Sequence, residues 1–152
     1  MGDHTIVLTI VGGQQIEVDA TKVVQVRPRT PAEKDFSNTR VDWAAVDYVV
    51  EEPEAVVDLV NGVRVAAGGK QLAQLKTANS LPIWFAGEKA TGPWHLLAPE
   101  LRDGVNSAYK IGNTVVPVGS TSEEVRAVII AAGGTPLTIR DDAPFAKDFP
   151  TK

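Results

Sequence analysis

The chain of 152 residues carries a formal net charge of −4, 43% hydrophobic residues and no cysteine. This length suits one ordinary domain or two small ones, and the apolar fraction excludes wholesale disorder. The missing cysteines exclude disulfides and thiolate chemistry, and an acidic balance without a large basic cluster disfavours nucleic-acid binding.

The N-terminal stretch MGDHTIVLTIVGG has no basic segment ahead of its apolar run, so we expect no signal peptide. No apolar run approaches the roughly 18 residues of a membrane span, so we expect no contact with a membrane. The sequence is therefore interpreted as that of a cytoplasmic protein or of one assembled into a virion.

The first half of the chain predicts strands joined by turns and closed by one helix. Residues 5–11, 14–18 and 22–27 have strand patterns, with Gly12-Gly13 as a hairpin turn. Residues 28–40 are polar with two prolines and predict a long loop, and residues 42–50 predict a strand pair or one long strand. A helix is expected near 53–61, beginning at Pro53 and ending at Asn61-Gly62, with its buried face formed by Val56, Leu59 and Val60.

The second half predicts a similar order. Strands are expected at 81–86, 94–97, within 101–111 and at 114–118, with one further short strand at 137–139. Thr121 and Glu124 have the spacing of a capping box, so a helix is expected near 122–131 and ends at Gly133-Gly134. Its buried face is predicted to hold Val125, Val128 and Ile129.

One local pattern occurs twice, 69 positions apart: residues 46–60 and 115–129 each predict a strand followed by a helix. We interpret this as a tandem duplication, and the alternative is a chance likeness of two strand-to-helix junctions. The predicted class is β-rich α+β, with two similar units that each hold antiparallel strands and one short C-terminal helix. The expected divisions are a first unit at 1–62, a linker at 63–80, a second unit at 81–133 and a C-terminal arm at 134–152.

One set of apolar and turn residues opens the chain and another closes the second half: Leu8, Gly12, Asp19, Val23 and Val26 at the opening and Thr121, Glu123, Glu124, Val125 and Ile129 at the close. This pattern resembles the small FlbD-type flagellar proteins, which are single units of this kind, and similar small proteins of bacterial viruses. This chain departs from that pattern in being doubled, in its long loop and in its C-terminal tail. The resemblance implies a small intracellular regulator or adaptor and brings no catalytic residues with it.

Catalytic and metal-binding motifs are not found in the sequence. His4 and His95 are the two histidines, and no metal-binding spacing accompanies them. Carboxylates occur as adjacent pairs, which point in different directions on a helix and make poor acid–base partners. We therefore predict no catalytic residue, no cofactor and no metal, and we expect that the protein is not an enzyme.

Aromatic side chains are the candidates for contact with partners. Trp84, Phe85 and Trp94 fall on or near one predicted hairpin and belong either to the core or to an interface, and Phe145 and Phe149 stand in the polar tail. The leading hypothesis is a non-enzymatic structural or assembly protein, namely a phage virion component of the capsid or tail. It would act through protein partners as a homo-oligomer or in a larger assembly, and the alternative is the FlbD-like regulator.

Overall fold

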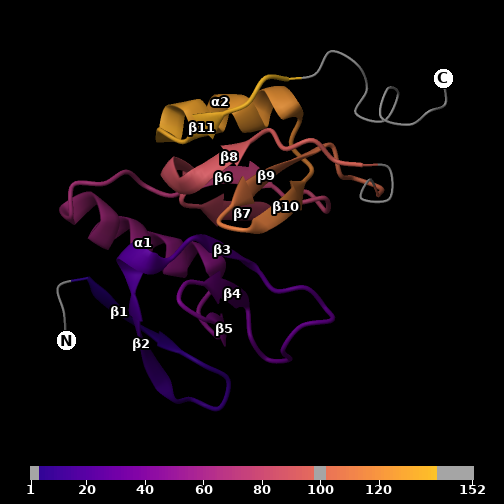
Figure 1. Ribbon diagram of the computed structural model, residues 1–152. Coiled ribbons are helices and arrows are strands. Elements are labelled where there is room, and N and C mark those ends of the chain that lie inside the picture. The colour runs from indigo at the N-terminus through magenta and orange to yellow at the C-terminus, as the bar shows by residue number, and fades with distance from the viewer. Residues whose placement is uncertain (1–3, 98–101, 140–152) are drawn as a thin grey trace. The chain divides into compact units, whose positions relative to one another are not determined.

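The computed structural model describes residues 4–97 and 102–139 (Figure 1). These residues form two α-helices and eleven β-strands, which confirms the predicted β-rich α+β class. They divide into two compact units, the first made of residues 4–73 with Ile83–Ala86 and the second of Gln74–Pro82 with the described residues from Gly87 onward. Among the described residues no helix is long and apolar enough to cross a membrane.

The first unit begins with an antiparallel hairpin in which Thr9 stands opposite Gln15. Gly12 and Gly13 make its turn at φ of +102° and +93°, a region that glycine enters without steric cost, so the predicted Gly-Gly hairpin is confirmed. An antiparallel sheet follows in the order β5-β4-β3-β7. The elements are β1 (Thr5–Thr9), β2 (Gln15–Asp19), the 3-10 turn η1 (Ala20–Lys22), β3 (Gln25–Pro28), β4 (Thr39–Asp42), β5 (Val46–Val49) and β7 (Pro82–Phe85).

Helix α1 (Pro53–Ala66) packs against β1, β3 and β4 of the same unit. Pro53 takes the first helical position, as predicted, because its missing N–H has no helical partner there. The helix continues beyond the predicted end at Asn61-Gly62. The side chain of Asn61 does not turn the chain, because its Oδ1 accepts a hydrogen bond from the N–H of Leu72 at 2.7 Å. Gly62 therefore lies inside α1, where one glycine costs only about 1 kcal/mol relative to alanine.

The buried face of α1 also differs from the predicted one. Leu59 is 44% exposed, whereas Val57 is 6% exposed beside the fully buried Val56 and Val60. Spacings of i, i+3, i+4 and of i, i+1, i+4 both mark one side of a helix, and packing against the strands decides between them.

The second unit holds a sheet in the order β10-β9-β8-β11. Neighbouring strands are antiparallel except β11, which runs parallel to β8. The predicted strand at 94–97 is wrong: the strand is β8, which ends at Gly92 before Pro93, a residue that has no N–H to donate. Beyond Pro93 the N–H of Trp94 still donates to the carbonyl of Ala108 on β9 at 2.7 Å. The elements are β6 (Ala73–Lys76), the 3-10 turn η2 (Gly87–Lys89), β8 (Ala90–Gly92), β9 (Ser107–Ile111), β10 (Thr114–Val118) and β11 (Thr135–Pro136).

Helix α2 (Ser122–Ala132) covers β8 and β9 and begins with the predicted capping box. The N–H of Glu124 donates to Thr121 Oγ1 at 3.2 Å, and the N–H of Thr121 donates to Glu124 Oε1 at 2.8 Å. Val125 and Ile129 are fully buried. Gly133 ends the helix at φ +86°, which agrees with the predicted glycine stop.

The expected divisions of the chain differ from the structure at three points. The segment 63–80, expected to be a linker, contains the last turn of α1 and strand β6. Residues 83–86, expected in the second unit, belong to the first, because Trp84 and Phe85 of β7 pair with Val26 and Gln25 of β3. The C-terminal arm begins with a short strand at 135–136 rather than at 137–139, and residues 140–152 lie outside the described part.

Both halves of the chain share an order of elements: two strands, a 3-10 turn, three strands and a helix. Asn38 and Asn106 also make matching contacts inside their units. Their backbone N–H groups donate to the carbonyls of Val49 and Val118 at 2.9 Å. Their side-chain Nδ2 atoms donate at 2.7 Å to the carbonyls of the next residues along those strands, Val50 and Gly119. These features support the tandem duplication, which stays a prediction.

The cap of α2 gives a first test of the fold. Thr121→Ala removes the acceptor for the N–H of Glu124, so the free energy of unfolding should fall by about 1 kcal/mol. Denaturant titration followed by circular dichroism measures the change. Thr138→Ala removes a hydroxyl from an exposed residue and is the control. Equal stability of the two variants would contradict the role of the cap.

Candidate functional site

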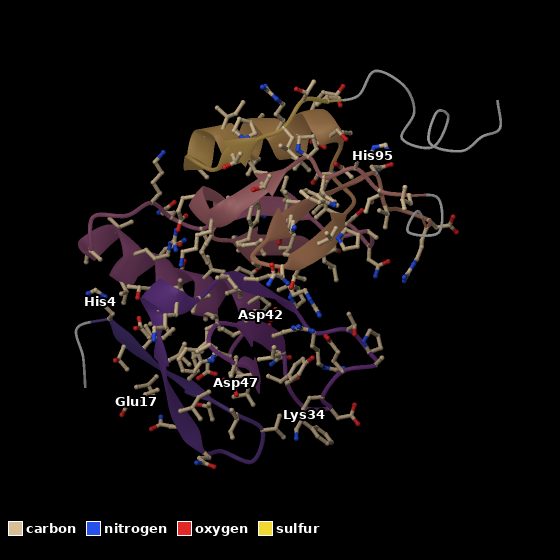
Figure 2. All side chains as sticks on the ribbon, viewed as in Figure 1. His4, Glu17, Lys34, Asp42, Asp47 and His95 are labelled. Atoms are coloured by element: carbon tan, nitrogen blue, oxygen red, sulfur yellow. The ribbon has the colours of Figure 1, made fainter. Side chains whose placement is uncertain are left out.

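The candidate site is the loop between β3 and β4, residues 29–38, which we call the Phe36 loop. Pro28 is the last residue of β3 and stands opposite Thr39, and the N–H of Arg29 donates to the carbonyl of Asn38 at 3.2 Å where the loop begins. Pro31 inside the loop disfavours helical backbone at the residue before it. The loop turns back at Thr30, where the N–H of Glu33 donates to the carbonyl of Thr30 at 3.0 Å. Figure 2 shows Lys34 on this loop.

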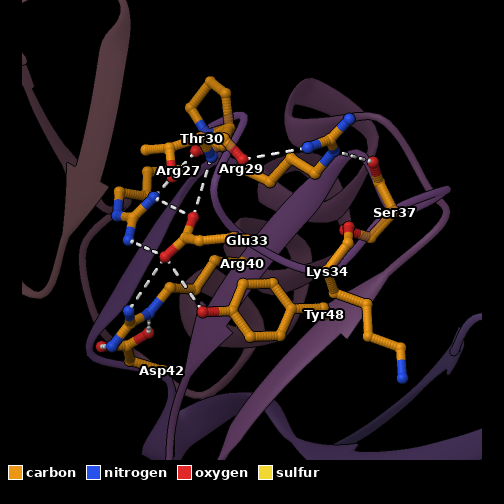
Figure 3. A network of polar contacts seen from close by, with 10 residues as sticks. Arg27, Arg29, Thr30, Glu33, Lys34, Ser37, Arg40, Asp42 and Tyr48 are labelled. Atoms are coloured by element: carbon orange, nitrogen blue, oxygen red, sulfur yellow. Dashed lines mark hydrogen bonds and ion pairs between the residues drawn. The ribbon is translucent and has the colours of Figure 1, made fainter.

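Glu33 anchors the loop to the sheet (Figure 3). Arg27 reaches its carboxylate with two parallel hydrogen bonds, Nη1 to Oε1 at 2.9 Å and Nη2 to Oε2 at 2.7 Å. Oε2 also accepts from the hydroxyl of Tyr48 at 3.0 Å and from Nη1 of Arg40 at 3.3 Å. Oε1 accepts the N–H of Thr30 at 2.8 Å. Both carboxylate oxygens are therefore shared among several donors.

Sheet register places the donors around Glu33. Arg27 stands directly opposite Arg40 on β4, and Arg40 stands directly opposite Tyr48 on β5. The three side chains form one row across three strands because partners in register lie on the same face of a sheet. Asp42 lies two residues after Arg40 on β4, and Nε of Arg40 donates to its Oδ1 at 2.7 Å.

The network changes the acid–base properties of its members. The two hydrogen bonds from Arg27 hold the pKa of Glu33 well below its usual range. The hydrogen bond to Asp42 raises the pKa of Arg40 above that of a free guanidinium. Burial raises the pKa of Tyr48, and its hydrogen bond to Glu33 adds to the rise. Glu33 is therefore a fixed anion that holds the loop and is poorly suited to take up a proton near neutral pH.

Arg29 and Ser37 close the outer part of the loop. Nε of Arg29 donates to the carbonyl of Ser37 at 2.8 Å, and Nη1 donates to the carbonyl of Thr30 at 2.9 Å. The hydroxyl of Ser37 donates to the carbonyl of Lys34 at 2.6 Å. Both sides of the tip, Lys34-Asp35-Phe36, are thereby tied down.

Phe36 stands at this tip and is 84% exposed. Its φ is +68°, in the left-handed region that costs a residue other than glycine about 1–2 kcal/mol. Lys34 and Asp35 beside it are also exposed. The structure therefore presents a phenyl ring, a cation and an anion to solvent on a loop with a defined conformation.

The aromatic residues predicted to contact partners lie elsewhere. Phe85 is 0% and Trp84 8% exposed, so both are core residues in this structure. Trp94 is half-buried, with Lys110 Nζ 4.7 Å from its ring centroid. Phe145 and Phe149 lie outside the described residues.

Sequence reasoning missed Phe36, although a signal was present. The sequence contains two Lys-Asp pairs, and each is followed by phenylalanine and preceded by proline at the same distance, in Pro31–Phe36 and Pro144–Phe149. Apolar residues that recur in one polar context are typical of short recognition motifs.

The two histidines belong to different units. His4 lies in the first unit and His95 in the second. Over residues 4–97 and 102–139, no group of three or more His, Cys, Asp or Glu side chains is arranged to hold a metal ion.

Comparison with known proteins gave no match, whether to protein-family models, to curated proteins or to solved structures. The resemblance to FlbD-type flagellar proteins therefore stays a prediction.

The anchoring of the loop by Glu33 is testable through pH. Because the folded pKa of Glu33 is lower than its unfolded value of about 4.3, ionised Glu33 stabilises the fold above that value. This contribution shrinks as pH falls below about 4.3 toward the folded pKa. Glu33→Gln should lower the free energy of unfolding by about 2 kcal/mol at pH 7, and the deficit should decrease from about pH 5 downward.

Urea titrations at several pH values measure this deficit. Asp35→Asn removes an exposed carboxylate two residues away and is the matched control. A deficit of Glu33→Gln that does not change between pH 7 and pH 3 would contradict the assignment.

Proposed function

We propose that this chain is a non-enzymatic structural or assembly protein that acts through protein–protein contacts, as an accessory component of a phage capsid or tail. The observation that carries the proposal is Phe36, exposed at the tip of a loop that the Glu33 network holds in place. Its conformation supports a role in recognition more than its exposure does.

Exposure alone would mean little, because single apolar residues are common on protein surfaces. Phe36 differs in two respects. Its φ of +68° is unfavourable for phenylalanine, and such strain is retained where the surrounding structure enforces it, often at binding sites. A residue such as asparagine would fit this backbone better and would not expose a ring to water.

The Glu33 network supplies what a binding loop needs. Ordering a flexible loop on association costs binding free energy, and a loop already held in its bound shape avoids that cost. Arg27, Arg40 and Tyr48 hold Glu33, and Arg29 closes the tip. An accessory protein of a capsid or tail needs rigid contact points of this kind, and aromatic anchors are enriched at interfaces.

Strain at Phe36 predicts a trade between stability and binding. Phe36→Asn relieves the backbone and loses almost no buried area, so the free energy of unfolding should rise by about 1 kcal/mol. The same variant should lose partner binding. Phe36→Val is also shorter than phenylalanine but is β-branched and tolerates positive φ poorly, so it should bring no gain. Thermal and urea unfolding measure the effect, and a less stable Phe36→Asn would contradict the strain argument.

Photo-crosslinking tests the contact itself. Phe36 is replaced by p-benzoylphenylalanine in the full chain, expressed in the cells that naturally contain it, and irradiated. We expect one discrete adduct, with either another protein or a second copy, that sediments with assembled particles. The control places the same amino acid at Val65, which is 53% exposed on α1. Equal labelling from both positions, or none, would overturn the proposal.

A further inference from the structure

A hollow on the second unit has features that complement the tip of the Phe36 loop. It lies between β6 and the first turns of α2 and has a volume of about 380 Å³, within the roughly 300–1,000 Å³ of ligand pockets. Leu75, Ala127 and Val128 give it an apolar lining, and Lys76 and Glu124 add one charge of each sign. Gln74 and Ser120 complete the lining.

Hydrogen bonds within the unit hold the two sides of this hollow together. The N–H of Lys76 donates to Ser120 Oγ at 2.9 Å, and the N–H of Gly119 donates to the carbonyl of Lys76 at 2.8 Å. Glu124 is held by the capping box, whose backbone hydrogen bond lowers its pKa, and the charge of Lys76 lowers it further. The Glu124 carboxylate is thus ionised and fixed at neutral pH, and the exposed ammonium of Lys76 lies within its field.

The tip of the Phe36 loop offers one partner for each of these groups. The phenyl ring of Phe36 suits the apolar lining, the carboxylate of Asp35 suits Lys76, and the ammonium of Lys34 suits Glu124. The side chains of Lys34 and Asp35 are exposed, so they can exchange water for a partner at little cost.

We infer that the Lys34-Asp35-Phe36 tip of one copy of this chain binds the hollow of a second copy. The inference rests on the proposed function and names the partner that the contact takes. Because the tip and the hollow are different surfaces, the contact is head-to-tail, and each bound copy leaves a tip and a hollow available. Such contacts build rings when the rotation between copies closes and filaments when it does not.

The recurrence of the motif in the sequence supports recognition of Lys-Asp-Phe as a unit. Pro31–Phe36 and Pro144–Phe149 share proline, lysine, aspartate and phenylalanine at the same spacing. In the loop, the hydrogen bonds to Glu33 come from Arg27, Thr30, Arg40 and Tyr48, so the Glu33 network does not explain why Asp35 and Phe36 recur. The second occurrence is a competing occupant for the same hollow, and the experiment distinguishes the two.

Charge exchange between Asp35 and Lys76 tests the contact. In full-length protein, Asp35→Lys and Lys76→Glu should each weaken self-association by about tenfold or more, which is about 1.4 kcal/mol. An equimolar mixture of the two variants should restore it. The tip of each variant then meets a hollow of opposite charge, whereas each variant alone pairs like charges. Sedimentation velocity and native mass spectrometry measure the size of the assemblies.

The mixture excludes indirect effects, because a variant that is merely destabilised is not rescued by a second variant. The double variant with both changes should also associate alone. Three results would overturn the inference: a wild-type chain that stays monomeric up to about 0.1 mM, no recovery on mixing, or a loss caused by Asp148→Lys but not by Asp35→Lys, which would assign the hollow to the tail.

Failure of this inference can be separated from failure of the proposed function. If the chain does not self-associate while the residue-36 crosslink forms with another protein, the inference fails and the proposed function stands. If no crosslink forms from position 36 at all, both fail. A crosslink between two copies, abolished by Lys76→Glu, supports both.

Discussion

The Glu33 carboxylate is the group on which the candidate site depends. Register on the sheet places Arg27 and Arg40 directly opposite each other, and two like charges in that position repel. Glu33, from the loop, joins both guanidinium groups and lies only 16% exposed. The anion offsets the repulsion, and the two cations in turn fix the loop. Removing Glu33 would leave two half-buried cations facing each other without the anion that joins them. The loop and the three strands beneath it are therefore held together as one unit.

That unit explains why a strained residue persists at its tip. A free loop would relax Phe36 out of positive φ, since the cost of about 1–2 kcal/mol exceeds thermal energy. Here the hydrogen bonds of Arg29 and Ser37 on either side of Lys34-Asp35-Phe36 hold the backbone. The network therefore holds Phe36 at positive φ with its ring exposed to solvent.

Local signals in the sequence predicted the local structure well. Gly12-Gly13 predicted the hairpin turn, Thr121 with Glu124 predicted the capping box, and the prolines predicted a long loop. The Glu33 network was not predictable, because its members lie 6 to 15 residues apart and meet only through strand register. Burial on α1 likewise required the packed structure, since spacing alone could not choose Val57 over Leu59. Phe36 could have been found from the recurrence of Lys-Asp-Phe.

The two halves also explain why the tip would bind only one of them. The backbone pairs Val50 with Thr9 in the first unit as it pairs Gly119 with Lys76 in the second, so Thr9 corresponds to Lys76. With Val56 set against Val125, Ala55 corresponds to Glu124 and Leu59 to Val128. At this place the first unit therefore keeps an exposed apolar side chain and carries a carboxylate, because Glu51 Oε1 accepts the N–H of Thr9 at 2.9 Å, but it has threonine in the position of Lys76 and so lacks that cation. Of these two places, only the one on the second unit offers both charges to the tip, so the proposed contact would join unlike faces of two copies and would propagate from copy to copy.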